Sequence, residues 1–125
     1  MDNPLETYYS ETDEHQEYET DERCHIIELL NQPDDRSQSV ARARVEPGVT
    51  TAWHRLKDTS ECYYILSGRG VAQIGEDLEQ EMQPHSIIRI PANTAQRISN
   101  VGDEDLVFLC FCVPAFSVEN YESVE

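Results

Sequence analysis

The sequence predicts an all-β domain of the barrel or sandwich type. Segments of four to eight residues rich in β-branched and aromatic side chains recur at short intervals, and Gly, Pro, Asn or Asp stands in each gap between them. No long stretch shows the 3.6-residue apolar period of a helix. Short strands that follow one another without intervening helices are typical of an antiparallel barrel or sandwich.

Eight strands are expected in chain order, at residues 24–30, 39–46, 61–67, 71–74, 78–82, 86–90, 95–99 and 106–113. The second of these strands alternates strictly between small apolar residues and arginines. Side chains alternate faces along a strand, so we expect Ala43 and Val45 to face the core. Arg42 and Arg44 are then expected on the outer face, with Glu79 and Glu81 as candidate partners.

The first 22 residues differ in composition from the rest, because they hold nine acidic residues and no lysine or arginine. A segment with so much charge and few apolar groups cannot offset the entropy lost on ordering. Residues 1–22 are therefore predicted to be a flexible acidic tail, disordered or loosely docked, with docking through Tyr8, Tyr9 and Tyr18 as the alternative. Residues 23–125 are predicted to form one barrel domain with a short C-terminal extension.

The formal net charge of −16 disfavours two classes of partner. An acidic surface repels nucleic-acid phosphates and anionic lipid heads, so we expect neither nucleic acid nor membrane as a partner. The N-terminal residues lack the basic and apolar parts of a signal peptide, and a cytoplasmic location is expected. The four cysteines form no CxxC pair, which favours reduced, buried thiols.

Two motifs resemble those of the cupin superfamily. In the first, Gly48, His54, Glu61 and Gly68 follow the order of a glycine, a His-x-His element, a glutamate and a second glycine. The second motif of cupins has a proline, a turn, a histidine and an asparagine, and those places are held here by Pro91, Asn93, Gln96 and Asn100. The resemblance covers residues 39–113. It implies a double-stranded β-helix, or jelly-roll barrel, with a pocket at its mouth, and often a homodimer.

The chain departs from the cupin pattern where a metal would bind. Metal-binding cupins use two histidines and a glutamate from the first motif and one histidine from the second, whereas these positions read His54, Leu56, Glu61 and Gln96. Leucine has no lone pair, and an amide oxygen is a weaker ligand for a transition metal than an imidazole. The resemblance therefore implies an incomplete ligand set of His54, Glu61 and Gln96. A divalent metal such as Zn, Fe, Ni or Mn is expected to bind weakly or not at all.

The same residues suggest two kinds of chemistry without a metal. His54 and Glu61 could serve as a catalytic acid and base, because a histidine held by a carboxylate works near neutral pH. They could equally form a satisfied polar pair. Leu56, Tyr63 and Gln96 are expected to line the pocket and contact a ligand, since Tyr63 shares the strand face of Glu61.

The leading hypothesis is a small cupin that binds a small organic molecule at His54, Glu61 and Gln96 and forms a homodimer. One alternative is a metal-dependent isomerase, lyase or oxygenase acting on a small organic substrate. The other is a non-catalytic oligomerisation or structural module with a packed interior. Fold alone does not decide among these functions.

Overall fold

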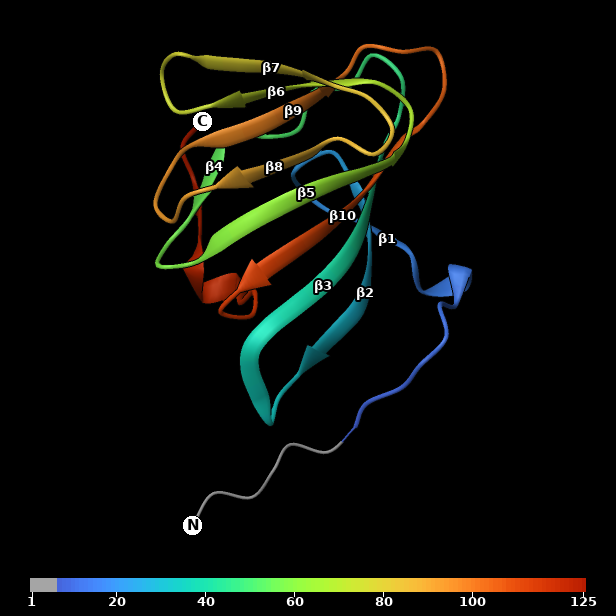
Figure 1. Ribbon diagram of the computed structural model, residues 1–125, viewed down its shortest axis with the longest axis vertical. Coiled ribbons are helices and arrows are strands. Elements are labelled where there is room, and N and C mark those ends of the chain that lie inside the picture. Colours follow the sequence, from blue (N-terminus) through green and yellow to red (C-terminus); the bar gives the residue numbers. More distant parts are fainter. Residues whose placement is uncertain (1–6) are drawn as a thin grey trace.

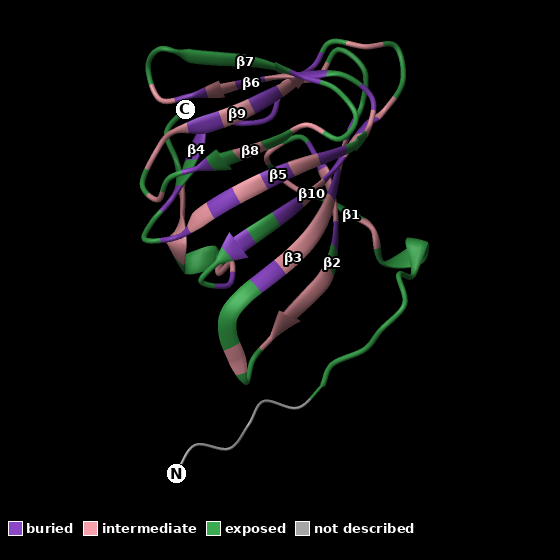
Figure 2. Ribbon diagram, in the orientation of Figure 1, coloured by how far each residue is buried: buried purple, intermediate pink, exposed green. Residues whose placement is uncertain are grey.

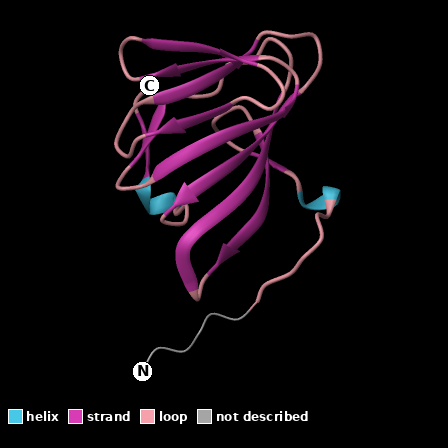
Figure 3. Ribbon diagram, viewed as in Figure 1, coloured by secondary structure: helices cyan, strands magenta, loops and turns pink. Residues whose placement is uncertain are grey.

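Two antiparallel sheets pack face to face in the computed structural model of the protein, which describes residues 7–125. The predicted tail therefore lies partly outside the described residues, at positions 1–6. Figure 1 shows the two sheets as the layers of a flattened barrel, and Figure 3 shows that the helical content is confined to two short turns near the chain ends. The expected all-β, jelly-roll class is confirmed. No helix among residues 7–125 has the length and apolar character needed to cross a membrane.

The strands divide into a sheet of six and a sheet of five. In spatial order, the six-stranded sheet contains β1 (Tyr18–Glu19), β2 (His25–Gln32), β3 (Asp35–Val45), β10 (Leu106–Val113), β5 (Ser60–Ser67) and β8 (Ile87–Ile90). The five-stranded sheet contains β11 (Tyr121–Ser123), β4 (His54–Leu56), β9 (Gln96–Asn100), β6 (Gly70–Ile74) and β7 (Leu78–Met82). The 3-10 helices are η1 (Glu14–Gln16) and η2 (Val118–Asn120). All eight expected strands are present, while β1, β4 and β11 were not among them.

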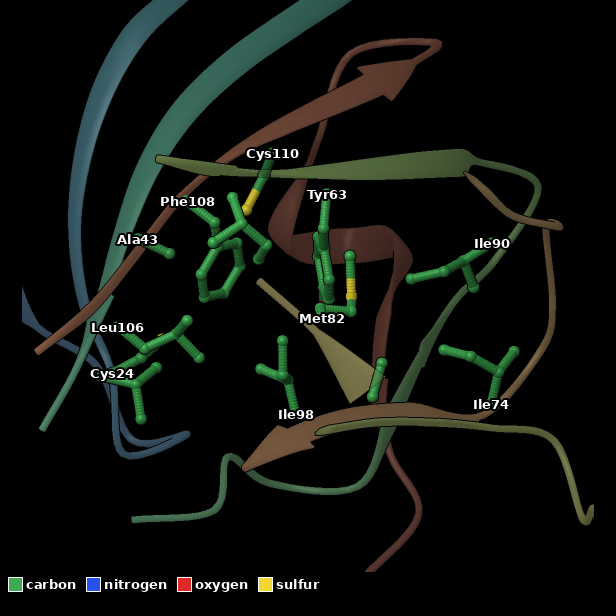
Figure 4. Packing of buried hydrophobic residues seen from close by; sticks show 13 residues of the cluster. Cys24, Ala43, Tyr63, Ile74, Met82, Ile90, Ile98, Leu106, Phe108 and Cys110 are labelled. Atoms are coloured by element: carbon green, nitrogen blue, oxygen red, sulfur yellow. The ribbon is translucent and has the colours of Figure 1, made fainter. Parts of the chain in front are cut away.

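Alternating burial builds the core between the sheets, as the banding of β5 and β10 in Figure 2 shows. Ala43 and Val45 are buried, and Arg42 and Arg44 lie on the other face of β3, as expected. Tyr63 and Phe108 from the six-stranded sheet meet Ile98 from the opposite sheet (Figure 4), and the two rings pack with centroids 4.7 Å apart. The core is therefore built from side chains of both sheets.

Gly68 and His85 are two of the described residues with a left-handed backbone. Gly68 has φ of +86°, and a Cβ atom at this position would lie 2.6 Å from the carbonyl oxygen of Asp105. Only glycine satisfies both conditions, which explains the closing glycine of the first motif. His85 occupies the turn before β8 with φ of +75°, and its Nδ1 lies 3.0 Å from the hydroxyl of Tyr64. The left-handed turn before β8 is therefore formed by a histidine in place of the usual glycine of such a conformation.

The described part of the acidic segment contacts the six-stranded sheet. β1 pairs with β2, Glu14 forms an ion pair of 2.7 Å with Arg42, and Glu17 forms one of 2.7 Å with Arg44. Asp105 is a second partner of Arg44, at 3.2 Å. The expectation that these arginines pair with Glu79 and Glu81 is wrong, because β7 lies at the edge of the other sheet. The outward arginines instead hold the N-terminal segment against the barrel.

Candidate functional site

A cavity of about 270 Å³ lies between the two sheets. Strands of both sheets form its walls, and residues from 18–28 and 116–121 also contribute to its lining. Its lining consists of Tyr18, Thr20, Asp21, Glu22, Cys24, Ile26, Glu28, Ser39, Ala41, Ala43, Thr51, His54, Leu56, Glu61, Tyr63, Ile98, Phe108, Cys110, Cys112, Phe116, Val118 and Tyr121. The volume is just below the roughly 300–1,000 Å³ of common ligand pockets, so the cavity suits a small organic molecule.

His54 enters the cavity from β4 and is held in one orientation. The side chain is buried, with 6% of the residue exposed, and Nδ1 lies 2.9 Å from the carbonyl oxygen of Ala52. A carbonyl can only accept a hydrogen bond, so Nδ1 carries a proton and Nε2 of the neutral ring has a free lone pair. Tyr121 stacks on the imidazole with ring centroids 5.0 Å apart. The backbone and Tyr121 thus fix the ring, and Nε2 is left to act on a ligand.

Glu61 enters from β5 on the opposite side of the cavity and is 8% exposed. Gln96 donates an amide hydrogen bond of 2.9 Å to its Oε1, and the Cys112 thiol donates one of 3.5 Å to its Oε2. Burial raises the pKa of the Glu61 carboxyl, and the hydrogen bonds from Gln96 and Cys112 oppose this shift. At a given pH, a larger fraction of the Glu61 carboxyl is therefore protonated than of an exposed glutamate.

Gln96 lies outside the cavity lining and holds the Glu61 carboxylate by a hydrogen bond. It faces His54 across the β4–β9 pairing and bonds to Glu61, but it does not line the cavity and is only 1% exposed. Its Oε1 is buried without a hydrogen-bond partner among the described residues. The structure therefore places Gln96 as a support for the carboxylate, where the sequence predicted direct contact with a ligand.

Leu56 and Tyr63 line the cavity, as the sequence predicted. Leu56 is 3% exposed and forms an apolar wall beside His54 on β4. Tyr63 lies on the face of β5 that carries Glu61, and burial raises the pKa of its hydroxyl well above the usual value. The hydroxyl is therefore neutral at physiological pH, so it can donate a hydrogen bond into the cavity.

The structure adds residues from the chain ends that sequence reasoning did not assign to the site. Glu22 has Oε2 only 3.7 Å from His54 Nδ1, and burial raises the pKa of Tyr121, which contacts both of these residues. Arg23 forms an ion pair of 2.7 Å with Glu125, and Glu125 also accepts a hydrogen bond of 3.1 Å from the Trp53 amide. Arg23 and Glu125 are thus joined next to His54. The aromatic residues in these acidic ends were the only sequence signal for this arrangement.

The residues present do not fit a resident transition-metal centre. Within residues 7–125, no three His, Cys, Asp or Glu side chains lie close enough together to hold a metal ion. The site offers one imidazole nitrogen, and both carboxylate oxygens of Glu61 already accept hydrogen bonds. Leu56 supplies an apolar wall at the second histidine position. A cation could find only weak, partial coordination here.

The fold and the pocket define a small jelly-roll protein with a ligand-sized interior. Residues 41–112 match the model of the Cupin domain family, and the chain belongs to this family. It is 36% identical over 88 residues to the uncharacterized protein MJ1618 of Methanocaldococcus jannaschii, with 70% of each chain covered. It is 30% identical over 77 residues to glucose-6-phosphate isomerase of Thermococcus onnurineus, which covers 58% of this chain and 40% of the isomerase.

Among solved structures, the fold is similar to that of Pac13, a nucleoside dehydratase. The TM-score is 0.77 at 21% identity, with 95% of this chain and 92% of Pac13 covered. The similarity therefore extends beyond the central barrel to nearly the whole of both chains. At this identity it establishes a common fold.

Proposed function

We propose that this cupin binds a small organic molecule in the cavity between its sheets. The observation that carries the proposal is a lining that is mostly apolar but holds a few convergent polar groups, an arrangement typical of ligand sites. His54 Nε2 has a free lone pair there, and Glu61 is held in place by Gln96 and Cys112. The apolar walls would bind the body of the ligand, and the polar groups would orient it.

Acid–base catalysis is the second candidate function, and it rests on the pairing of His54 with Glu61. Nε2 of the neutral His54 ring can accept a proton, and burial makes the Glu61 carboxyl able to hold one. An elimination of water needs both a base and an acid, and Pac13, which shares the fold, is a nucleoside dehydratase. In such a step, His54 would take a proton from carbon while Glu61 protonates the departing hydroxyl.

The binding proposal can be tested with a variant that fills the cavity. Ala41 lines the cavity, and leucine at this position would occupy part of its volume. The purified protein is incubated with a metabolite extract, separated from unbound molecules, and the retained molecules are identified by mass spectrometry. We expect the parent and an Ala92→Leu control, which adds the same atoms outside the cavity, to retain a ligand that Ala41→Leu does not.

The same experiment separates the three functions that the sequence left open. A ligand retained unchanged at one molecule per site supports a binding protein. A product that forms in excess over protein, and that Glu61→Gln abolishes, supports catalysis. If no molecule is retained and Ala41→Leu stabilises the fold, the interior is a packed core, and both proposals are overturned in favour of a structural module.

A further inference from the structure

The charges around the cavity have one sign. Among the described residues that line the cavity, the acidic side chains are those of Asp21, Glu22, Glu28 and Glu61. The other ionisable side chains of the lining are cysteines, tyrosines and His54, and neither lysine nor arginine is among them. The nearby arginines are engaged elsewhere: Arg23 pairs with Glu125, while Arg42 and Arg44 pair with glutamates on the outer face. A bound anion would therefore meet repulsion in a partly desolvated site, where charge interactions are stronger than in water.

His54 adds a hydrogen-bond acceptor to this acidic lining. Its Nδ1 proton is donated to the Ala52 carbonyl, and Nε2 has no hydrogen-bond partner among residues 7–125 although the side chain is more than nine-tenths buried. Nε2 is not among the described side-chain atoms that are both fully enclosed and unpartnered, so it remains accessible, and a ligand that brings an N–H group can donate a hydrogen bond to it. A carboxylate or phosphate oxygen has no proton to give to this nitrogen at neutral pH.

The remaining walls suit the same chemistry. Five aromatic rings line the cavity, those of Tyr18, Tyr63, Phe108, Phe116 and Tyr121. The faces of aromatic rings attract cations as well as apolar groups. A bound cation would also favour the ionised form of Glu61, against the effect of burial on its pKa.

We propose that the cavity takes a small organic cation, an amine with an apolar body, whose ammonium group lies among Glu22, Glu61 and His54 Nε2. This inference rests on the proposed binding function and specifies its ligand class. It separates this chain from the glucose-6-phosphate isomerases to which it is similar, because the phosphate of a sugar phosphate would meet four carboxyls and no cationic side chain among the described lining residues.

Three ligands of matched size test the role of charge. Phenethylamine, 2-phenylethanol and phenylacetate share a phenyl ring and differ in carrying a positive, no or a negative charge. Each is titrated calorimetrically into the full chain at pH 7.5 and 150 mM salt, where screening weakens long-range surface effects. We expect phenethylamine to bind at least tenfold more tightly than 2-phenylethanol, and phenylacetate to bind most weakly.

Variants then locate the charge that matters. Glu22→Gln keeps the shape of the side chain and should weaken phenethylamine binding about tenfold, while 2-phenylethanol binding changes less than twofold. Glu81→Gln removes the same charge from β7, away from the cavity, and should leave both affinities unchanged. Thermal melts verify that each variant is folded, and Glu28→Gln replaces Glu22→Gln if the latter is not.

The outcomes distinguish this inference from the function on which it rests. Tighter binding of 2-phenylethanol or phenylacetate than of phenethylamine overturns the cation inference and leaves the binding function intact. An equal loss of affinity in Glu22→Gln and Glu81→Gln also overturns it, because the attraction is then due to net charge. If no test ligand binds but a metabolite is retained, the cation inference alone fails; if none is retained either, both fail.

Discussion

Replacing both Leu56 and Gln96 with histidine should convert this site into a metal centre. The sequence motif and the structure agree on the geometry, because His54 and Leu56 both lie on β4 with buried side chains and Gln96 is paired directly with His54. The double variant would offer three imidazoles together with Glu61, where the parent offers one imidazole. Zinc, nickel and iron favour such nitrogen-rich sets, so the affinity of the variant should exceed that of the parent by orders of magnitude.

The magnitude follows from what each substitution removes. Leu56 is 3% exposed, and burying a polar ring without a partner in its place costs about 1–3 kcal/mol. Gln96→His removes the 2.9 Å bond to Glu61, a charge-assisted interaction worth about 1.5–3 kcal/mol. The metal-free variant should therefore be less stable than the parent by about 2.5–6 kcal/mol. Metal at 100 times its Kd would restore about 2.7 kcal/mol, or about 10 °C in Tm for a chain of this size.

Thermal melts with and without zinc, alongside calorimetric titrations, measure both quantities. The parent should show a small shift in Tm that chelator reverses without unfolding, and each single variant should fall between the parent and the double variant. If the parent binds zinc as tightly as the double variant, a complete metal site exists already and our account of the donor set is incorrect. If the folded double variant binds no zinc, these positions do not converge as in metal-binding cupins.

Three further predictions concern charge, backbone and assembly. Burial raises the pKa of Glu61, so the folded chain holds the Glu61 proton more tightly than the unfolded chain does. The stability that this proton contributes is complete below the unfolded pKa of about 4.3. It is lost as the pH rises through the folded pKa. Glu61→Gln should therefore be more stable than the parent at pH 8, with a difference that shrinks toward pH 4 in urea denaturation, and a less stable variant at pH 8 would contradict this. Gly68→Ala should lower the free energy of unfolding by about 2–3 kcal/mol, because φ is +86° and the added Cβ would clash with a backbone oxygen. The control Gly48→Ala has a similar φ of +79° but open space around the added Cβ, so it should lower the free energy of unfolding by only about 1 kcal/mol. We also propose a homodimer formed through exposed apolar residues of the six-stranded sheet, including Phe111 and Val113. Light scattering should give a mass of twice 14.4 kDa, and Phe111→Lys should reduce it to the mass of the monomer. A monomeric parent at micromolar concentrations would refute the proposal.

The sequence predicted the barrel well because strict alternation leaves little freedom. In residues 39–46, a shift of one position would bury the arginines, so the faces of the strand follow directly from the pattern. Short strands carry no such information: β1 has two residues and β11 has three, and both form because neighbouring strands offer free backbone groups.

The candidate site was only partly predictable for a similar reason. His54, Leu56, Glu61 and Tyr63 could be placed from strand parity, and they do line one cavity. The alternation of side chains along the strand placed Gln96 on the correct face. It could not show that the Gln96 amide hydrogen-bonds to Glu61 and does not line the cavity. Glu22 lies 32 positions before His54, within an acidic segment whose composition suggested a solvated tail. Its place beside the imidazole depends on tertiary contacts that no local pattern encodes.

The cavity is lined partly by residues outside the barrel range that matches the family. Residues 41–112 supply the family barrel, whereas Glu22, Phe116 and Tyr121 lie outside this range and also line the cavity. A substitution at Glu22 or Phe116 would therefore alter the cavity lining at a position outside the barrel residues that match the family. For the proposed ligand, part of the contact surface is formed by segments that the family match does not include.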